Sequence, residues 1–151
     1  MSAPPVVRLR AVEDADLPIL FEHQADPVAT AMAAFPARDR VSFMAHWASI
    51  VADRTVVART ILAGDTVVGT IVCWIDGERR EVGYWIGRAF WGRGYATRAL
   101  ALLFEEVAGR PLFAHVAEGN IGSRRVLEQC GFVTVGEAEV DGVREATLRL
   151  D

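Results

Sequence analysis

The spacing of apolar residues predicts that the first third of the chain is mostly helical. A short strand is expected at residues 6–10. After the acidic run at 13–16, apolar side chains at 17, 20 and 21 share one face of a helix, and the carboxylates before them favour its start. A second, short helix is expected from Asp26 to about residue 34. A third is expected over residues 39–51, where apolar positions recur with a helical period.

The rest of the chain predicts strands that surround a strand–helix–strand unit. The expected strands are residues 55–62, 66–75, 81–87, 111–116, 132–137 and 143–150. The expected helices are residues 95–107, ended by Gly109, and residues 120–131, capped by Asn120 and stopped by Gly131. This order predicts an α/β or α+β fold with a mixed sheet, in which the strands on either side of helix 95–107 are parallel.

Composition and charge narrow the class of protein. At 151 residues the chain is long enough for one domain with its own core. The net charge is −4 and every cationic side chain is arginine, which argues against non-specific binding of nucleic acid. Cys73 and Cys130 lie in apolar segments without metal-like spacing, so buried free thiols in a reducing compartment are expected. Without a signal-peptide pattern or a run of about 18 apolar residues, a cytoplasmic protein with no membrane partner is expected.

A glycine-rich segment at residues 90–97, Phe-Trp-Gly-Arg-Gly-Tyr-Ala-Thr, joins the expected strand 81–87 to the helix that follows. At such a junction the first N–H groups of the helix lack partners and the helix dipole adds partial positive charge, which favours a phosphate or pyrophosphate. Gly92 and Gly94 lack a Cβ where a ligand must come close, and Arg93 adds a formal charge between them. The same residues also suit a tight turn without a ligand.

Two other phosphate-binding loops do not fit this segment. A P-loop has Lys-Ser or Lys-Thr after its last glycine, whereas Gly94 is followed by Tyr95 and the chain contains no lysine. A Rossmann fingerprint has a small residue where this chain has Thr97, and it lies near the start of its domain rather than past mid-chain. Neither a P-loop nucleotide-binding site nor a dinucleotide-binding fold is therefore expected.

Three segments together resemble the GNAT superfamily of N-acetyltransferases. Residues 91–96, Trp-Gly-Arg-Gly-Tyr-Ala, match its coenzyme A loop, Gln/Arg-x-x-Gly-x-Gly/Ala, except at Trp91. That departure is typical of the RimJ/RimL-type branch, whose members are ribosomal-protein alanine acetyltransferase-like. The same branch carries the Gly-Tyr-Trp found at residues 83–85 and the Asn-x-x-Ser-x-Arg-Val-Leu-Glu-x-x-Gly-Phe found at residues 120–132. The resemblance covers nearly the whole chain and is weakest before Thr55.

The resemblance implies a single N-acetyltransferase domain over residues 1–151. Its implied fold is a mixed, mostly antiparallel central sheet of six to seven strands flanked by about four helices. Two strands of that sheet would splay apart, and the pantetheine arm of acetyl-CoA would enter the gap. The implied activity is direct transfer of acetyl from acetyl-CoA to a primary amine of a small molecule, peptide or protein N-terminus, without a metal. A monomer or homodimer is expected.

The resemblance also indicates how the coenzyme binds. Backbone groups of the strand before the loop are expected to hold the pantetheine amides and to supply an oxyanion donor, the alternative being that they only pair within the sheet. The loop and nearby arginines, Arg124 included, are expected to hold the phosphates. The expected coenzyme-binding residues are Tyr84, Trp85, Ile86, Gly92, Arg93, Gly94, Tyr95, Ala96, Thr97, Asn120, Ser123 and Arg125.

Glu81 is the candidate general base. By period-2 alternation it lies on the strand face of residues 83 and 85, where a carboxylate could take the ammonium proton through a water. The alternative is an exposed strand-end glutamate paired with Arg79 or Arg80. Glu118 is a second candidate for the same role.

Ser123 is the candidate acid for the leaving thiolate. Many members of the superfamily use a tyrosine in the matching helix, and this chain has none there. The serine hydroxyl could face the coenzyme sulfur, or it could only help cap the helix.

Other residues carry weaker expectations. Arg98 stands where the branch commonly has a glutamate, and the three histidines, at positions 23, 46 and 115, are scattered and expected to be structural. The arm at residues 39–51 is implied to help form the acceptor pocket, with Trp47 and Trp85 as candidate lining residues, although core packing is the commoner role of tryptophan. Two rival functions are a coenzyme A-binding sensor without catalysis and a transferase that uses another acyl-CoA.

Overall fold

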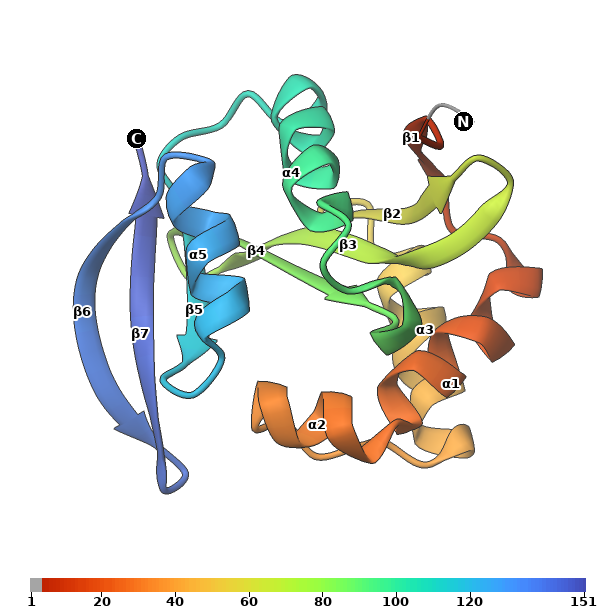
Figure 1. Cartoon of the computed structure of the whole chain (residues 1–151), viewed down its shortest axis with the longest axis horizontal. Coiled ribbons are helices and arrows are strands. Elements are labelled where there is room, and N and C mark those ends of the chain that lie inside the picture. Colours follow the sequence, from red (N-terminus) through yellow and green to blue (C-terminus); the bar gives the residue numbers. More distant parts are fainter. Residues whose placement is uncertain (1–3) are drawn as a thin grey trace.

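Seven strands form one sheet in the order β1-β2-β3-β4-β5-β7-β6 (Figure 1). The computed structural model describes residues 4–151. Neighbouring strands are antiparallel except β4 and β5, which are parallel, so the expected mixed sheet is confirmed. The strands are β1 (Val7–Ala11), β2 (Val57–Ala63), β3 (Thr66–Asp76), β4 (Arg79–Ile86), β5 (Leu112–Ala117), β6 (Val133–Val140) and β7 (Val143–Leu150).

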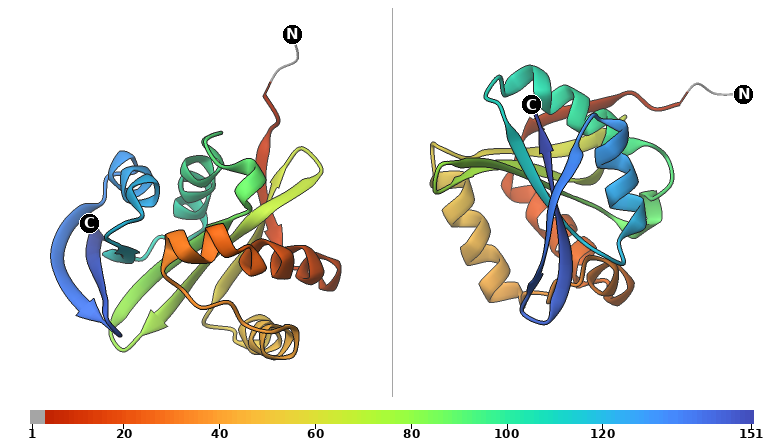
Figure 2. Two further views of the ribbon diagram at one scale, coloured as in Figure 1. Left: turned by 60° about the horizontal axis from the view of Figure 1, so that its bottom comes forward. Right: turned by 90° about the vertical axis from the view of Figure 1, so that its left-hand side faces the viewer.

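Five α-helices cover the two faces of the sheet, with α4 and α5 on one face and α1 and α3 on the other (Figure 2). The residue pattern predicted all five, whereas the resemblance implied about four. The short helix expected from Asp26 is α2, which is separated from α1 by the extended backbone of Asp26 and capped by its side chain. The helices are α1 (Leu17–Ala25), α2 (Pro27–Ala33), α3 (Arg40–Ala52), α4 (Tyr95–Glu106) and α5 (Ile121–Gln129), with 3₁₀ helices η1 (Asp14–Asp16) and η2 (Arg88–Phe90).

Two hydrophobic cores lie on opposite faces of the sheet. The larger packs α4 and α5 on the strands, with Leu100, Leu103 and Leu127 buried against Ile71 and Leu148. The smaller packs α1 and α3 on β3, and its buried members are Leu20, Phe43 and Trp47. The sheet therefore separates the α4/α5 side of the molecule from the α1/α3 side.

Asp16 lies at the start of the first helical segment, as the acidic run predicted, and is also part of a buried polar network. Its carboxylate accepts two hydrogen bonds from the Arg10 guanidinium, at 2.7 and 2.8 Å, and others from Thr60 Oγ1 at 2.7 Å and Glu13 N at 2.9 Å. Together the Arg10 guanidinium and the other donors hold the pKa of Asp16 down at about 2. The network fixes the start of the α1 segment on β1 and β2.

The parallel strands β4 and β5 pair over only two residues before they diverge. Arg80 lies opposite Leu112 and Glu81 opposite Phe113. Beyond that point β4 continues to Ile86 paired with β3 alone, while β5 stays paired with β7. The expected splay is therefore present, and it leaves one edge of β4 free to face the interior of the molecule.

Several element ends differ from the sequence expectation. Helix α4 ends at Glu106, not at 107, because Val107 turns to an extended backbone and is buried in the core, so Gly109 lies beyond the helix and does not end it. Strand β6 runs to Val140, three residues past the expected end, because it stays paired with β7 up to the hairpin turn. Both cysteines are free, but only Cys73 is fully buried and Cys130 is partly exposed.

Candidate active site

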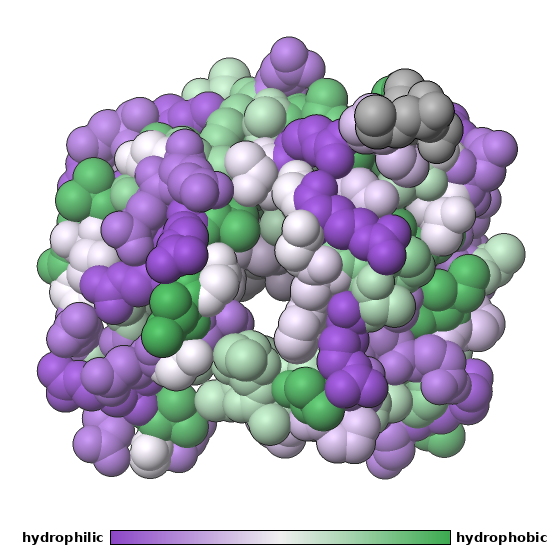
Figure 3. Space-filling model, in the orientation of Figure 1, coloured by the Kyte–Doolittle hydropathy of each residue, from purple (hydrophilic) through white to green (hydrophobic). Residues whose placement is uncertain are grey.

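A cleft of about 580 Å³ opens on the α4/α5 side, at the place where β4 leaves β5. Figure 3 shows this face hollowed between α4 and α5 above and α2 below. Eleven of the thirteen expected site residues line it, the exceptions being Arg93 and Glu81. The lining residues are Tyr84, Trp85, Ile86, Gly92, Gly94, Tyr95, Ala96, Thr97, Asn120, Ser123 and Arg125, together with Ala29, Met32, Ala33, Phe90, Trp91, Gly122, Val126 and Gln129.

The glycine-rich loop presents the bare start of α4 to this cleft. Gly92 and Gly94 have φ values of 76° and 77°, in the left-handed region that favours glycine, and a Cβ at either would meet no other atom within 4 Å. Within residues 4–151 no side chain caps α4, and its main-chain bonds begin with Arg98 N donating to Gly94 O at 3.1 Å. The N–H groups of the first turn are thus available to an anion.

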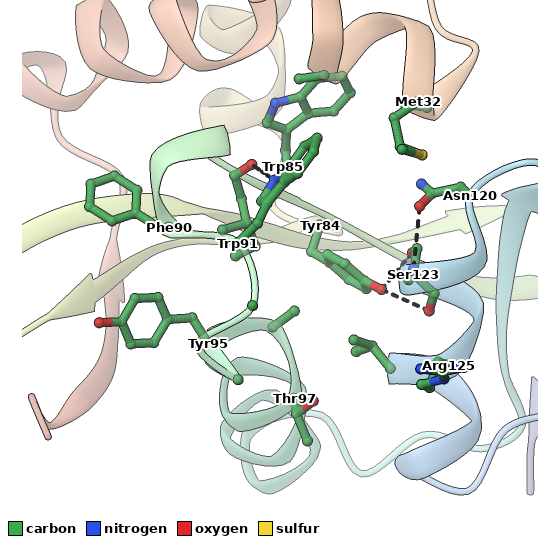
Figure 4. Close-up of a pocket in the computed structure, with 18 of the residues that line it drawn as sticks. Met32, Tyr84, Trp85, Phe90, Trp91, Tyr95, Thr97, Asn120, Ser123 and Arg125 are labelled. Atoms are coloured by element: carbon green, nitrogen blue, oxygen red, sulfur yellow. Dashed lines mark hydrogen bonds between the residues drawn. The ribbon is translucent and has the colours of Figure 1, made fainter.

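Side chains around the loop have structural roles that the sequence did not show. The Tyr95 ring is buried and points away from the cleft, so Tyr95 contributes main chain there (Figure 4). Arg93 is exposed and lies off the cleft wall. The Arg98 side chain donates to Arg93 O at 3.1 Å and to Pro5 O at 3.2 Å, so this arginine braces the loop from behind. The Trp91 indole donates to Ile86 O at 2.9 Å. This carbonyl oxygen belongs to one of the residues expected to bind the pantetheine amides, and it already has one hydrogen-bond partner.

A chain of polar groups crosses the cleft from β4 to α5. The Tyr84 hydroxyl lies 2.6 Å from the Ser123 hydroxyl and donates to Ser123 O at 3.2 Å (Figure 4). Asn120 caps α5 through its side-chain oxygen, which accepts from Ser123 N at 3.3 Å. The Ser123 hydroxyl is therefore not spent on the cap. Burial raises the pKa of Tyr84 to about 12, so its phenol stays protonated. A tyrosine from β4 therefore reaches the start of α5, where the chain has no tyrosine of its own.

Glu81 is neither exposed nor paired with Arg79 or Arg80, so that alternative is wrong. Its side chain is 4% exposed and lies against His115 of β5, whose Nε2 is 3.2 Å from Oε1 and 3.1 Å from Oε2. His115 Nδ1 in turn lies 3.1 Å from the Thr147 hydroxyl. Glu81 is the last residue of β4 that pairs with β5, and His115 lies two residues beyond its partner Phe113. Glu118 instead faces Arg144 at the surface.

A second cavity of about 530 Å³ lies on the α1/α3 side and shares Tyr84 and Trp85 with the cleft. Trp47 and Trp85 both line it, and Trp47 is at the same time a buried member of the smaller core. His23 and His46, which are far apart in the sequence, also line this cavity. Burial lowers the pKa of both, so both are neutral. The helical spacing of apolar residues at 39–51 predicted the helix that forms this wall, but it did not indicate that the two histidines line the cavity.

Among residues 4–151, no group of three or more histidine, cysteine or acidic side chains is placed to hold a metal ion. No helix in the same range is both long and apolar enough to cross a membrane.

Comparison with known proteins places this chain in a family. The model of the acetyltransferase (GNAT) domain matches residues 7–133. Over 70 residues the chain is 39% identical to the protein named "Putative ribosomal N-acetyltransferase YdaF" of Bacillus subtilis (strain 168). That match spans 44% of this chain but only 38% of the length of that curated relative.

Two solved structures share the fold over almost their full length. RimL, a ribosomal L7/L12 alpha-N-protein acetyltransferase in complex with coenzyme A, is 16% identical with a TM-score of 0.82, covering 95% of this chain and 93% of its own. The aminoglycoside acetyltransferase AAC(6')-Ib, also in complex with coenzyme A, is 15% identical with a TM-score of 0.80, covering 96% and 94%. At these identities the likeness concerns the fold alone. Because the family match extends over residues 7–133, the protein belongs to the GNAT acetyltransferase family.

Proposed function

We propose that this protein is an N-acetyltransferase that moves acetyl directly from acetyl-CoA to a primary amine. One observation carries the proposal: the uncapped start of α4 and the free edge of β4 face the same cleft. A pyrophosphate needs N–H donors without side chains in the way, and a pantetheine arm needs an unpaired strand edge. The cleft provides the two features next to each other.

Different residues of the cleft bind different parts of the coenzyme. The N–H groups of Tyr95, Ala96 and Thr97 face the pyrophosphate, and the Arg125 guanidinium adds charge at the α5 wall. The pantetheine amides lie along Tyr84 to Ile86, and the Asn120 amide group, whose oxygen caps α5, keeps its NH₂ for the same arm. Arg93, exposed at the loop surface, is left for the outer phosphate groups.

The reaction joins the amine nitrogen to the acetyl carbon and breaks the carbon–sulfur bond. The nitrogen loses one proton, the departing thiolate gains one, and the products are an amide and coenzyme A. A main-chain N–H of β4 next to Tyr84 stabilises the oxyanion. The Ser123 hydroxyl, held by Tyr84, donates a hydrogen bond to the sulfur.

Glu81 remains our proposed base, but only through a water. It lines neither cavity, so its carboxylate cannot touch the amine directly. His115, whose side chain is 36% exposed, then offers the proton a route from Glu81 to solvent. The sequence match to YdaF, together with the three branch motifs, leads us to extend the proposal to the RimJ/RimL branch, with a protein N-terminus as one class of acceptor alongside small amines.

The proposal is tested by ligand binding and turnover together. Acetyl-CoA should raise the melting temperature by mass action, whereas NADH and ATP should not. Free thiol should appear when a primary amine is added. Tight binding of acetyl-CoA without thiol release from any amine would instead support the sensor. Preference for a longer acyl-CoA would support a transferase that uses an acyl-CoA other than acetyl-CoA.

A further inference from the structure

The cavity on the α1/α3 side, which we call the aromatic cavity, is built for an apolar occupant. Its walls include five aromatic side chains: Phe35, Phe43, Trp47, Trp74 and Trp85. Tyr84 also borders it, but its ring points into the coenzyme cleft toward Ser123. Leu20, Ile50, Val56 and Val72 add aliphatic surface. Its volume of about 530 Å³ is typical of a small-molecule site.

Most polar side chains of its wall are already bound to the protein itself. The Gln24 amide donates to Phe21 O at 3.3 Å and to Arg38 O at 3.1 Å, and its oxygen accepts from Arg38 N at 2.9 Å. The Thr70 hydroxyl donates to Arg59 O at 3.0 Å. An occupant rich in polar groups, such as the main chain of a peptide, would find few partners and would lose its water on entry.

The aromatic cavity also lacks the negative charge that a polycation needs. Among the described residues that line it, Asp53 is the only carboxylate, and it accepts hydrogen bonds from Thr55 N at 2.9 Å and Thr55 Oγ1 at 2.7 Å. Arg38 brings a positive charge to the same wall, and His23 and His46 are neutral. A polyamine or aminoglycoside would carry several ammonium groups into a site whose single carboxylate can neutralise one of them at most.

The position of the aromatic cavity fixes which end of the occupant reacts. It meets the coenzyme cleft at Tyr84 and Trp85, so the attacking nitrogen must lie at that end and the rest of the molecule between the sheet and α3. The Trp85 indole donates to His23 O at 3.2 Å, which holds this part of the wall in place.

We propose that the acceptor is a small primary amine carried on an apolar, aromatic body that fills the aromatic cavity. This inference rests on the proposed function, since it names the substrate of the same reaction. The amine nitrogen forms the amide bond and gives up one proton, and the ring is packed between the tryptophans and stays unchanged.

An amine panel at saturating acetyl-CoA, read out as free thiol, tests the inference. We expect 2-phenylethylamine to exceed both ethylamine and spermidine in kcat/KM by at least about tenfold, a difference typical of burying an apolar group in a fitted pocket. If spermidine, kanamycin or a peptide with an N-terminal alanine is the better substrate, the inference is wrong and the proposed function stands. If no amine causes release of free thiol, both this inference and the proposed function are wrong.

Two variants locate the effect in the aromatic cavity. A Cβ at Gly83 would meet the Trp74 ring at 3.3 Å, so Gly83→Ala should raise the KM for 2-phenylethylamine several-fold and leave acetyl-CoA affinity unchanged. Gly136→Ala is the matched control, since a Cβ there meets nothing within 4 Å. Ile75→Glu changes a partly exposed residue of the cavity wall, so the fold should persist while preference moves toward spermidine. Unchanged selectivity in both would overturn the inference.

Discussion

Replacing Tyr84 by phenylalanine removes the hydroxyl that holds Ser123, and the size of the effect on turnover separates two roles for the pair. In one role, Ser123 passes a full proton to the thiolate and draws a replacement from Tyr84. In the other, the two hydroxyls only supply an oriented hydrogen bond. The contact is short, 2.6 Å between Oη and Oγ, and Tyr84 is partly buried.

The pKa of the phenol decides between these roles. Burial raises the pKa of Tyr84 to about 12, whereas a cysteine-like thiol has a pKa of about 8.5. A difference of about 3.5 units makes complete transfer from the phenol uphill by about 5 kcal/mol. A neutral hydrogen bond contributes only about 0.5–1.5 kcal/mol. Tyr84→Phe should therefore reduce kcat by about tenfold, whereas loss of a general acid would cost about 10²–10⁴.

The assay is thiol release for Tyr84→Phe, Ser123→Ala and the double variant between pH 6 and 9. We expect similar single effects, a double effect smaller than their product, and no new pH dependence, because one hydrogen-bonded unit is removed each time. Tyr95→Phe is the matched control, since Tyr95 is the other tyrosine and its ring points away from the cleft. A thousandfold loss in Tyr84→Phe, or full activity in Ser123→Ala, would refute the hydrogen-bond role.

Three further predictions concern stability and the base. Because its folded pKa lies below the unfolded value, Asp16 contributes stability above about pH 4 that is lost as the pH falls toward 2. Asp16→Asn should lower the free energy of unfolding by about 2 kcal/mol at pH 7, and the difference from the parent should vanish near pH 2 in urea titrations. Asn120→Ala should cost about 1 kcal/mol and weaken acetyl-CoA binding, whereas Asp39→Ala, which removes the cap of α3, should cost a similar amount and leave binding intact. Glu81→Gln should reduce kcat by about a hundredfold without affecting acetyl-CoA affinity; equal rates for Glu81→Gln and the surface control Glu78→Gln would exclude Glu81 as the base.

The parts of the site that are formed by residues close together in the sequence could be predicted from the sequence. The loop at residues 90–97 carries its own backbone constraints, because two left-handed glycines and a helix start leave few other conformations. The Asn120 cap and the turn at Gly131 follow from short-range rules in the same way.

The parts that depend on pairing between distant segments could not be predicted. Glu81 meets His115 only because β4 and β5 stay together for two residues before they diverge, a register that no local pattern encodes. Tyr84 reaches Ser123 across that same divergence. The aromatic cavity requires α1 and α3 to pack on the sheet at a particular distance, which depends on the volumes of many side chains at once.

The affinity of a folded variant for acetyl-CoA tests the central claim, that the start of α4 binds the coenzyme phosphates. Gly94→Glu places bulk and negative charge at that start, and Gly142→Glu makes the same change at φ 79° in the β6–β7 turn, so both variants carry the same backbone strain. Calorimetric titration should show acetyl-CoA binding abolished in Gly94→Glu and retained in Gly142→Glu. Equal affinity in the two variants would contradict the account.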